Sequence, residues 1–398
     1  MPRFALVHDW FDCVAGSENV VREMLRCFPS SAVFSLVDHL PEQERRELGI
    51  DAIETSFIQR LPFSKKWFRN YLPLMPLAIE QLDLSSYDVI LSSSHAVAKG
   101  VITNAEQLHI SYVHTPIRYA WDMYHEYLQQ AGATRGIKSA LIRAVLHYIR
   151  TWDRGTADRP DIYVANSHFV AARIKKTYGR EAQVIYPPVD LHRWSTCYRK
   201  EPYFLAAGRL VPYKRFDLLV DAFARLPDQR LVIIGDGPEF KKLKARAGEN
   251  VTMLGYQNDE VLSDYMRRAR GFVFAAVEDF GILPVEAQAC GTPVIGMRRG
   301  GVAETVIDGE TGLLFDEQTP ECIAETIRAF SDLPDSFLDP DHIRANAERF
   351  NAERFRSEFS ELVKSAIQQR KGAPAAAPLS IPQRLPVSYS ASVNPVYG

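Results

Sequence analysis

The sequence is poor in cysteine, with five among 398 residues, and that number is odd. The five are spread along the chain, and no two have the spacing of a metal-binding pair: Cys13, Cys27, Cys197, Cys290 and Cys322. This scarcity argues against a disulfide framework and against a cysteine-bound metal. It indicates reduced thiols in a cytosolic protein.

The chain also lacks an excess of charge and any long apolar run. Its net charge of −2 argues against a protein that binds nucleic acid through bulk charge. No apolar run approaches the roughly 18 residues that a membrane-spanning helix needs. The first residues enter a strand pattern without a signal peptide, so we expect a cytoplasmic protein. The G-x-G-x-x-G fingerprint of dinucleotide-binding proteins is missing as well.

A regular alternation of strand and helix patterns is present instead. The length suits two domains, and 46% hydrophobic with 24% charged residues is a globular composition. We expect strands at 4–8, 32–36, 87–92, 109–113, 161–165 and 183–186, and then at 203–207, 230–234, 251–254, 271–276 and 293–296. The alternation is typical of α/β proteins with doubly wound parallel sheets, which bind ligands at the carboxyl ends of their strands.

Two other segments set the limits of this pattern. Pro187-Pro188 interrupts the alternation, and the segment from Asp190 to Pro202 reads as a linker between two domains. The stretch 371–398 is rich in Ala, Pro and Ser without periodicity, and predicts a disordered tail.

The stretch from Glu278 to Glu286 is the most informative part of the chain. It follows a predicted buried strand and has Gly281 in its turn, while Pro284 suits the first position of a helix. Glu286 then falls in the first helical turn. Free amides at such a helix start can bind a phosphate, and the two carboxylates can accept hydrogen bonds from hydroxyl groups. On local grounds alone, a helix-capping acid plus an ordinary loop acid explain the pattern equally well.

Further candidate residues follow other predicted strands. Arg209 and Lys214 come after the strand 203–207, and Gly235 ends the strand 230–234. Cations at this edge suit a diphosphate whose charge grows as it leaves. His114 ends the strand 109–113, although a lone histidine is usually structural. Near the start, Gly16 lies in a small-residue loop before a helix that we expect from Asn19 to Phe28, with Ser17 as its N-cap.

Two segments of the first half combine basic with apolar or aromatic residues. The segment 65–76 has three cations beside Trp67 and Phe68, and 137–154 is a long amphipathic helical pattern with Lys138 and several arginines. Such stretches can lie on an anionic membrane surface. An ordinary solvated helix face is the competing interpretation, because amphipathicity describes any surface helix.

Taken together, the motifs resemble the retaining glycosyltransferases of family 4, which have the GT-B fold, over about residues 4–367. The E-x7-E spacing of Glu278 and Glu286 is the most specific match, followed by the Gly208-Arg209-Leu210 and Gly235-Asp236-Gly237 turns. The family's N-terminal Gly-Gly loop is met only in part, because alanine precedes Gly16. The His114 to Asp122 segment resembles members that build bacterial surface polysaccharides, several of which are mannosyltransferases.

This resemblance implies two Rossmann-like domains that face each other across a cleft. Residues 1–190 would bind the acceptor and 200–349 the nucleotide sugar, and a last helix at 350–368 would return to the first domain. It also implies roles for individual residues. Arg209 and Lys214 would neutralise the donor diphosphate, Glu286 would bind the ribose, and Glu278 the sugar hydroxyls.

The remaining implied roles concern backbone groups and one histidine. Amides near Phe280, Gly281 and Ile282 would hold the sugar and its phosphate, with His114 beside the sugar. Gly16 would let the backbone approach the diphosphate. Gly235 is a further donor-binding position, and the backbone around Gly255 would hold the base. The cation pair would replace a metal ion, so we expect neither metal nor cofactor.

The expected function is transfer of a hexose to a lipid-linked oligosaccharide or polysaccharide. The preferred assignment of the hexose is mannose, with GDP-mannose as its donor. The enzyme would be cytoplasmic and peripheral on the membrane, with a nucleotide sugar and a lipid-linked glycan as partners and no nucleic acid. The alternatives are a UDP-sugar-dependent glucosyl- or galactosyltransferase, a nucleotide-sugar 2-epimerase, and an inactive nucleotide-sugar-binding partner.

Overall fold

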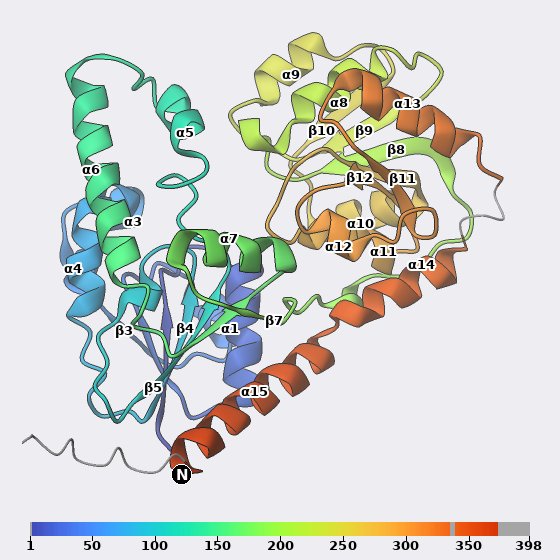
Figure 1. Ribbon diagram of the computed structural model, residues 1–398. Coiled ribbons are helices and arrows are strands. Elements are labelled where there is room, and N and C mark those ends of the chain that lie inside the picture. The colour runs from blue at the N-terminus through green and yellow to red at the C-terminus, as the bar shows by residue number, and fades with distance from the viewer. Residues whose placement is uncertain (1, 335–338, 373–398) are drawn as a thin grey trace, which may run out of the picture.

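A computed structural model describes residues 2–334 and 339–372, and they form two domains that are each built on a parallel sheet (Figure 1). The first sheet has seven strands in the order β3-β2-β1-β4-β5-β6-β7. The second has six in the order β10-β9-β8-β11-β12-β13. In each sheet the chain runs outward from a central strand and then continues on its other side, which is the doubly wound order. The expected α/β class with two doubly wound sheets is confirmed.

The central strands of both sheets are mostly buried. The first sheet consists of β1 (Phe4–His8), β2 (Ala32–Ser35), β3 (Ile53–Thr55), β4 (Val89–Ser94), β5 (Leu108–Val113), β6 (Ile162–Ala165) and β7 (Gln183–Val184). The second consists of β8 (Glu201–Ala207), β9 (Leu231–Ile234), β10 (Val251–Gly255), β11 (Ala269–Phe274), β12 (Val294–Met297) and β13 (Gly312–Phe315). The sequence pattern located all of these except β3 and β13, which are the edge strands at one end of each sheet.

The helices cover both faces of each sheet. The first domain has α1 (Gly16–Cys27), α2 (Glu42–Glu47), α3 (Ser64–Trp67), α4 (Met75–Glu80), α5 (Tyr124–Gln130), α6 (Gly136–Gly155) and α7 (His168–Tyr178). The second has α8 (Phe216–Phe223), α9 (Phe240–Arg246), α10 (Asp259–Arg268), α11 (Ile282–Ala289), α12 (Val302–Thr305), α13 (Pro320–Ser331) and α14 (Pro340–Ala347). The described chain ends with α15 (Ala352–Gly372).

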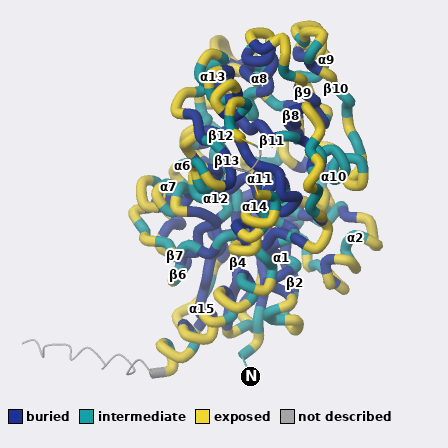
Figure 2. Tube along the Cα trace, turned by 90° about the vertical axis from the view of Figure 1, so that its right-hand side faces the viewer, coloured by how far each residue is buried: buried dark blue, intermediate teal, exposed yellow. Residues whose placement is uncertain are grey.

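Alternate side chains of the central strands point to opposite faces, as strand geometry requires. Along β1, Leu6 packs in a cluster with α1 and α15, whereas Ala5 and Val7 pack in another with α4. Along β8, Leu205 joins the cluster that contains α11 and α14, and Phe204 joins the one with α8 and α13. Figure 2 shows buried residues at the centre of each domain and exposed residues on the outer surface.

The last helix returns to the first domain. Phe355 and Phe359 of α15 are buried in the cluster that contains α1 and β1, and Arg356 pairs with the buried Glu23. Helix α15 includes Lys371 and Gly372, which the sequence assigned to a disordered tail, and the rest of that tail, 373–398, lies outside the described residues. The domain boundaries at 1–190, 200–349 and 350–368 stay predictions.

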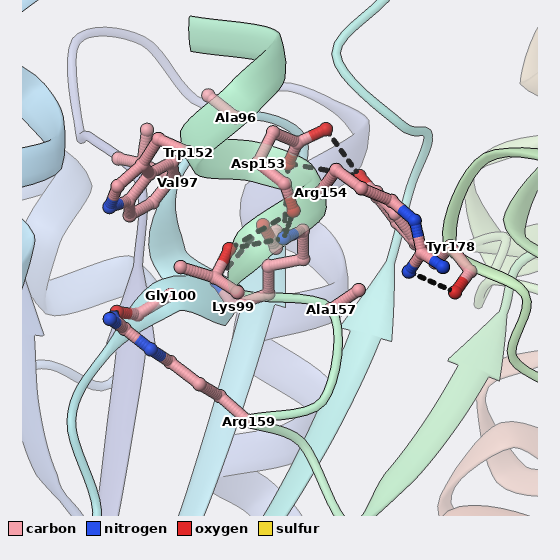
Figure 3. Close-up of polar contacts among 12 residues, drawn as sticks. Ala96, Val97, Lys99, Gly100, Trp152, Asp153, Arg154, Ala157, Arg159 and Tyr178 are labelled. Carbon is pink, nitrogen blue, oxygen red and sulfur yellow. Dashed lines mark hydrogen bonds and ion pairs between the residues drawn. The ribbon is translucent and has the colours of Figure 1, made fainter. Parts of the chain in front are cut away.

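A buried ion pair anchors the base of α6 (Figure 3). The Lys99 Nζ atom lies 3.0 Å from Asp153 Oδ1, and the two side chains are 1% and 0% exposed. Lys99 also donates to Thr156 Oγ1 at 2.8 Å, while Tyr178 donates its hydroxyl to both Asp153 oxygens. Trp121 donates its indole N–H to Asp153 at 2.7 Å. The pair therefore joins α6 and α7 to the loop that follows β5 and carries His114.

Candidate active site

A cavity of about 480 Å³ lies between the two domains, at the carboxyl ends of the central strands. Doubly wound sheets bind ligands at this edge, where the strand order reverses. The lining includes seven of the site residues predicted from the sequence: Gly16, His114, Lys214, Glu278, Phe280, Gly281 and Ile282. These residues come from both domains, so the site is complete only when the domains face each other.

Four other predicted residues lie outside the lining of this cavity. Arg209 is exposed in the loop after β8, and within residues 2–334 and 339–372 its guanidinium has no ion pair. Gly235 and Gly255 lie at the ends of β9 and β10, and the amide of Gly235 donates to the carbonyl of Gly255 at 2.8 Å. Glu286 is half-buried in α11. The structure thus brings seven of the predicted residues together at one cavity, with Lys214 but not Arg209 of the two cations predicted for the diphosphate.

The helix of the E-x7-E stretch starts earlier than the sequence suggested. Gly281 has a φ of 83° and turns the chain so that α11 begins at Ile282. Pro284 is therefore the third helical residue, and the prediction that it is the first was wrong. Glu286 is the fifth residue, beyond the first turn where we expected it. Proline costs little here because the first four amides of a helix have no partner within it.

The start of α1 also differs from the expectation. The helix begins at Gly16, with Ala15 as N-cap, and neither Asn19 as its start nor Ser17 as its cap is correct. Glu18 explains the difference, because its Oε2 accepts the amide of Ala15 at 3.0 Å and the hydroxyl of Ser17 at 3.0 Å. The Glu18 carboxylate thus accepts hydrogen bonds at the start of the helix, where the N-cap residue has no polar side chain.

The N-terminal ends of α1 and α11 meet at this cavity. A Cβ atom on Gly16 would lie 2.6 Å from Cδ1 of Ile282, so a larger residue would require the Ile282 side chain to move. Each helix start presents free amides and the positive end of a helix dipole. Two such ends that face one cavity favour an anion between them.

Lys214 and Glu278 form an ion pair in the wall of the cavity. Their Nζ and Oε1 atoms lie 3.0 Å apart, and the side chains are 14% and 19% exposed. Lys214 ends the 3-10 turn η5 (Pro212–Lys214), and Glu278 lies between β11 and α11. A cation and a carboxylate at this distance provide one group for a phosphate and one for hydroxyl groups.

Behind the cavity lies a buried polar network that the sequence reasoning missed. Asp9, directly after β1, accepts four consecutive amides, from His95 to Ala98, at 2.6–2.9 Å. His114 Nε2 lies 2.8 Å from the hydroxyl of Ser93, which His8 also contacts. Burial lowers the pKa of His114 to about 3, so its imidazole is neutral at pH 7. His114 can therefore orient a ligand by hydrogen bonds but brings no positive charge.

A set of polar contacts joins the two domains beside the cavity. Asp279, next to Glu278, pairs with Arg173 of α7 and lies 3.6 Å from Arg118. Its carbonyl accepts the Ser167 hydroxyl at 2.6 Å. Glu304 of α12 accepts the amides of His168 and Phe169 at 2.8 Å each, and so binds the N-terminus of α7. These contacts hold Glu278 against the first domain, and sequence patterns give no sign of them because each pair spans both domains.

Glu286 gives a prediction about stability and pH. Burial raises its pKa from 4.5 to about 7, and the nearby Arg193 only partly opposes this. The folded protein then binds one more proton than the unfolded chain between these values, so this group lowers the unfolding free energy as pH rises through them. Glu286→Gln should raise the unfolding free energy by about 1–2 kcal/mol at pH 8, after a discount for partial exposure.

At pH 4.5 the difference between Glu286→Gln and the unchanged protein should vanish. Urea unfolding followed by circular dichroism at pH 4.5, 6, 7 and 8 measures it. A difference that stays constant over this range would show that Glu286 does not titrate as its burial implies.

Family comparisons match both halves of the chain. Residues 14–193 match the model described as Glycosyltransferase Family 4, and residues 191–350 match Glycosyl transferases group 1. An uncharacterised glycosyltransferase of Methanocaldococcus jannaschii is 32% identical over 174 residues, 42% of this chain and 48% of that protein. A GDP-mannose-dependent alpha-(1-6)-phosphatidylinositol monomannoside mannosyltransferase of Mycolicibacterium smegmatis is 30% identical over 234 residues, 50% of this chain and 61% of that protein. The chain thus spans about half the length of the curated relatives that it matches.

Solved structures share the fold. A protein of Anabaena, crystallised with UDP and glucose, has a TM-score of 0.67 at 19% identity, over 92% of this chain and 100% of its own. The GT-B fold expected from the sequence is confirmed.

Proposed function

We propose that this chain, whose halves match the models of Glycosyltransferase Family 4 and Glycosyl transferases group 1, transfers a hexose from a nucleotide sugar, with retention, to a lipid-linked oligosaccharide or a growing polysaccharide. The observation that supports this most is the cavity between the domains. It combines two helix N-termini, the cation of Lys214 and the carboxylate of Glu278. An anion with a hydroxyl-rich neighbour fits that combination, and a sugar diphosphate is such a molecule.

In this proposal the diphosphate binds between the starts of α1 and α11, beside Lys214. Arg209, exposed and unpaired among the described residues, adds charge from the edge of β8. Glu278 accepts hydroxyls of the sugar, and neutral His114 contacts its reacting face. The leaving phosphate takes the proton of the acceptor hydroxyl as the new glycosidic bond forms on the same face. The fixed cations stabilise its growing charge, so the reaction needs no metal.

The ion pairs of Asp279 with Arg118 and Arg173 suit this chemistry. They hold the two domains closed beside Glu278. Closure excludes water from the sugar and so limits hydrolysis of the donor.

Mannose from GDP-mannose is our first donor assignment. The similarity to the Mycolicibacterium smegmatis mannosyltransferase supports it, whereas the Anabaena structure with UDP and glucose supports the alternative of a UDP-sugar donor. Thermal shift against GDP, UDP, ADP and dTDP, with chelator present, separates these cases, since a ligand stabilises the native state according to its affinity. A shift with GDP alone supports the mannosyl donor, and a shift with UDP alone rejects it.

Measurements of turnover test the two other classes of protein that the sequence left open. A nucleotide-sugar 2-epimerase would convert its substrate without any acceptor. An inactive binding partner would show a nucleotide shift but no transfer in a full lipid extract. Transfer of labelled sugar to lipid that depends on Lys214 and Glu278 would exclude both.

We also propose that the first domain binds an anionic membrane surface. None of the described helices is both long and apolar enough to span a bilayer. On the flank where α3, α4 and α6 lie (Figure 1), however, large apolar side chains are exposed, including Phe63 at 69%, Ile137 at 90% and Leu141 at 66%. Lys65 and Lys66 of α3 are exposed as well, and they follow Phe63 closely in the sequence. An apolar surface with flanking lysines is typical of interfacial binding.

Reversing Lys65 and Lys66 to glutamate should weaken binding to anionic vesicles at least about ten-fold, because each lysine near such a surface contributes about 1 kcal/mol. Arg69, in the same segment, is a poorer choice because it pairs with Asp12 at 2.7 Å. Sedimentation with phosphatidylglycerol vesicles measures the effect. Lys241→Glu/Lys244→Glu on α9 of the second domain is the matched control. Equal loss in both variants would show a bulk-charge effect and remove this surface from the proposal.

A further inference from the structure

A second cavity, of about 550 Å³, lies next to the first. Arg118 and Tyr213 line both cavities, and the guanidinium of Arg118 lies over the Tyr213 ring at 5.4 Å. One wall comes from α5 in the first domain and the other from the segments around η5 and α9 in the second. Figure 1 shows α5 and α6 projecting from the first sheet so that α5 faces the second domain. The volume is that of a typical ligand site, about 300–1,000 Å³.

This cavity lies on the opposite side of the second sheet from Glu286. Its second-domain wall includes Lys242 of α9, which packs on the sheet face with α8 and α13, whereas α11 with Glu286 packs on the other face. Val277 lines the second cavity and its neighbour Glu278 lines the first. A molecule in the second cavity therefore lies near Glu278, which is predicted to bind the sugar, and far from Glu286, which is predicted to bind the ribose.

The charges in this cavity largely neutralise one another. Arg215 pairs with Asp217 at 3.1 Å, and Lys242 pairs with Glu239 at 3.1 Å. Since paired charges leave little net field, the cavity is poorly suited to a phosphate-bearing ligand. The rings of Phe169 and Tyr213 add apolar surface.

Several hydrogen-bonding groups in the lining are free. Among the described residues, the side chains of Glu126, Gln129 and Gln130 on α5, and of Arg299 in the second domain, have no hydrogen bond or ion pair. Together they offer both donors and acceptors. Free polar groups of both kinds beside aromatic rings match a molecule with many hydroxyls and apolar ring faces.

We propose that this second cavity binds the acceptor, and that the acceptor is a neutral oligosaccharide of more than one sugar unit. Its reacting end would extend between the two cavities, beside Arg118 and Tyr213, and point toward Glu278. The proposal rests on the function proposed above and adds the acceptor's binding site and chemical class. Domain closure builds the cavity from both domains, so the acceptor site and the donor site form in the same step.

Isothermal titration with mannotriose, maltotriose and chitotriose tests it, in the presence of the nucleotide that gave a thermal shift. We expect at least one trisaccharide to bind. Glu126→Ala/Gln129→Ala/Gln130→Ala should weaken that binding about ten-fold or more, since each side chain loses a hydrogen bond. The three residues are exposed, so folding is not at risk. Nucleotide affinity should stay within about two-fold, because none of them lines the donor cavity. Gln43→Ala/Glu47→Ala on exposed α2 is the matched control.

The outcomes distinguish this inference from the function on which it rests. A nucleotide shift without binding of any trisaccharide overturns the inference and leaves the donor site standing. Binding that the triple variant does not change places the acceptor elsewhere and also overturns it. Tighter binding of glucose 1-phosphate than of the trisaccharides, lost in Arg299→Ala, overturns the neutral class. Absence of any nucleotide shift contradicts the proposed function itself.

Discussion

Replacing Lys99 with methionine is expected to lower the free energy of unfolding by about 3–5 kcal/mol, because it leaves a buried carboxylate without its cation. The Lys99 and Asp153 side chains are at most 1% exposed, with Nζ 3.0 Å from Oδ1. Methionine fills a similar volume, so the loss reports the charge rather than a cavity. The hydrogen bonds from Trp121 and Tyr178 to Asp153 would remain, but these neutral donors do not replace the positive charge of Lys99. Urea unfolding at pH 7 measures the change.

Two further variants separate charge from packing. Lys99→Met/Asp153→Asn carries no buried charge and should recover part of the stability that the single change loses. Arg46→Met removes a partner of Glu42 in a pair whose side chains are 75% and 73% exposed, and should change stability by less than about 1 kcal/mol. If Lys99→Met cost as little as Arg46→Met, the buried pair would not anchor α6.

The fold could be predicted from the sequence wherever a strand is buried on both faces. β1 and β8 read as continuous apolar runs because helices cover both of their faces, and the sequence located them within two residues. β3 has three residues, none of them buried, and β13 begins with a glycine, so neither carries a strong pattern. Their pairing comes from neighbours that are distant in sequence, which local periodicity does not encode.

The candidate site also has a part that the sequence could predict and a part that it could not. Residues that follow a buried strand, such as His114 and Lys214, could be placed at the functional edge from the sequence because parallel strands end there. Asp9 follows β1 in the same way, and this position was the signal that could have identified it. The contacts of Asp279 with Arg118 and Arg173 could not be found, since they depend on how the two domains face each other.

Lys214→Ala is expected to lower kcat about 10²–10³-fold, the usual cost of losing one group that stabilises charge in the transition state. Under the proposed function, Lys214 neutralises the leaving diphosphate, whose charge grows as the sugar departs. The donor KM should rise less than kcat falls, because the cation acts more on the transition state than on the bound donor. Initial rates of sugar transfer at several donor concentrations measure both. Lys175→Ala, on an exposed lysine of α7, is the matched control and should leave both unchanged.

The ion pair with Glu278 offers a competing account of the same loss, and a double variant separates the two. Lys214 Nζ lies 3.0 Å from Glu278 Oε1, so Lys214 could act only by holding that carboxylate in place. Glu278→Gln removes the charge that then needs a partner. If Lys214 stabilises the diphosphate, Lys214→Ala/Glu278→Gln stays at least as slow as Lys214→Ala, and Lys214→Arg, which keeps the cation, recovers part of the rate. A double variant faster than Lys214→Ala would assign the lysine to Glu278 and contradict its role toward the leaving group.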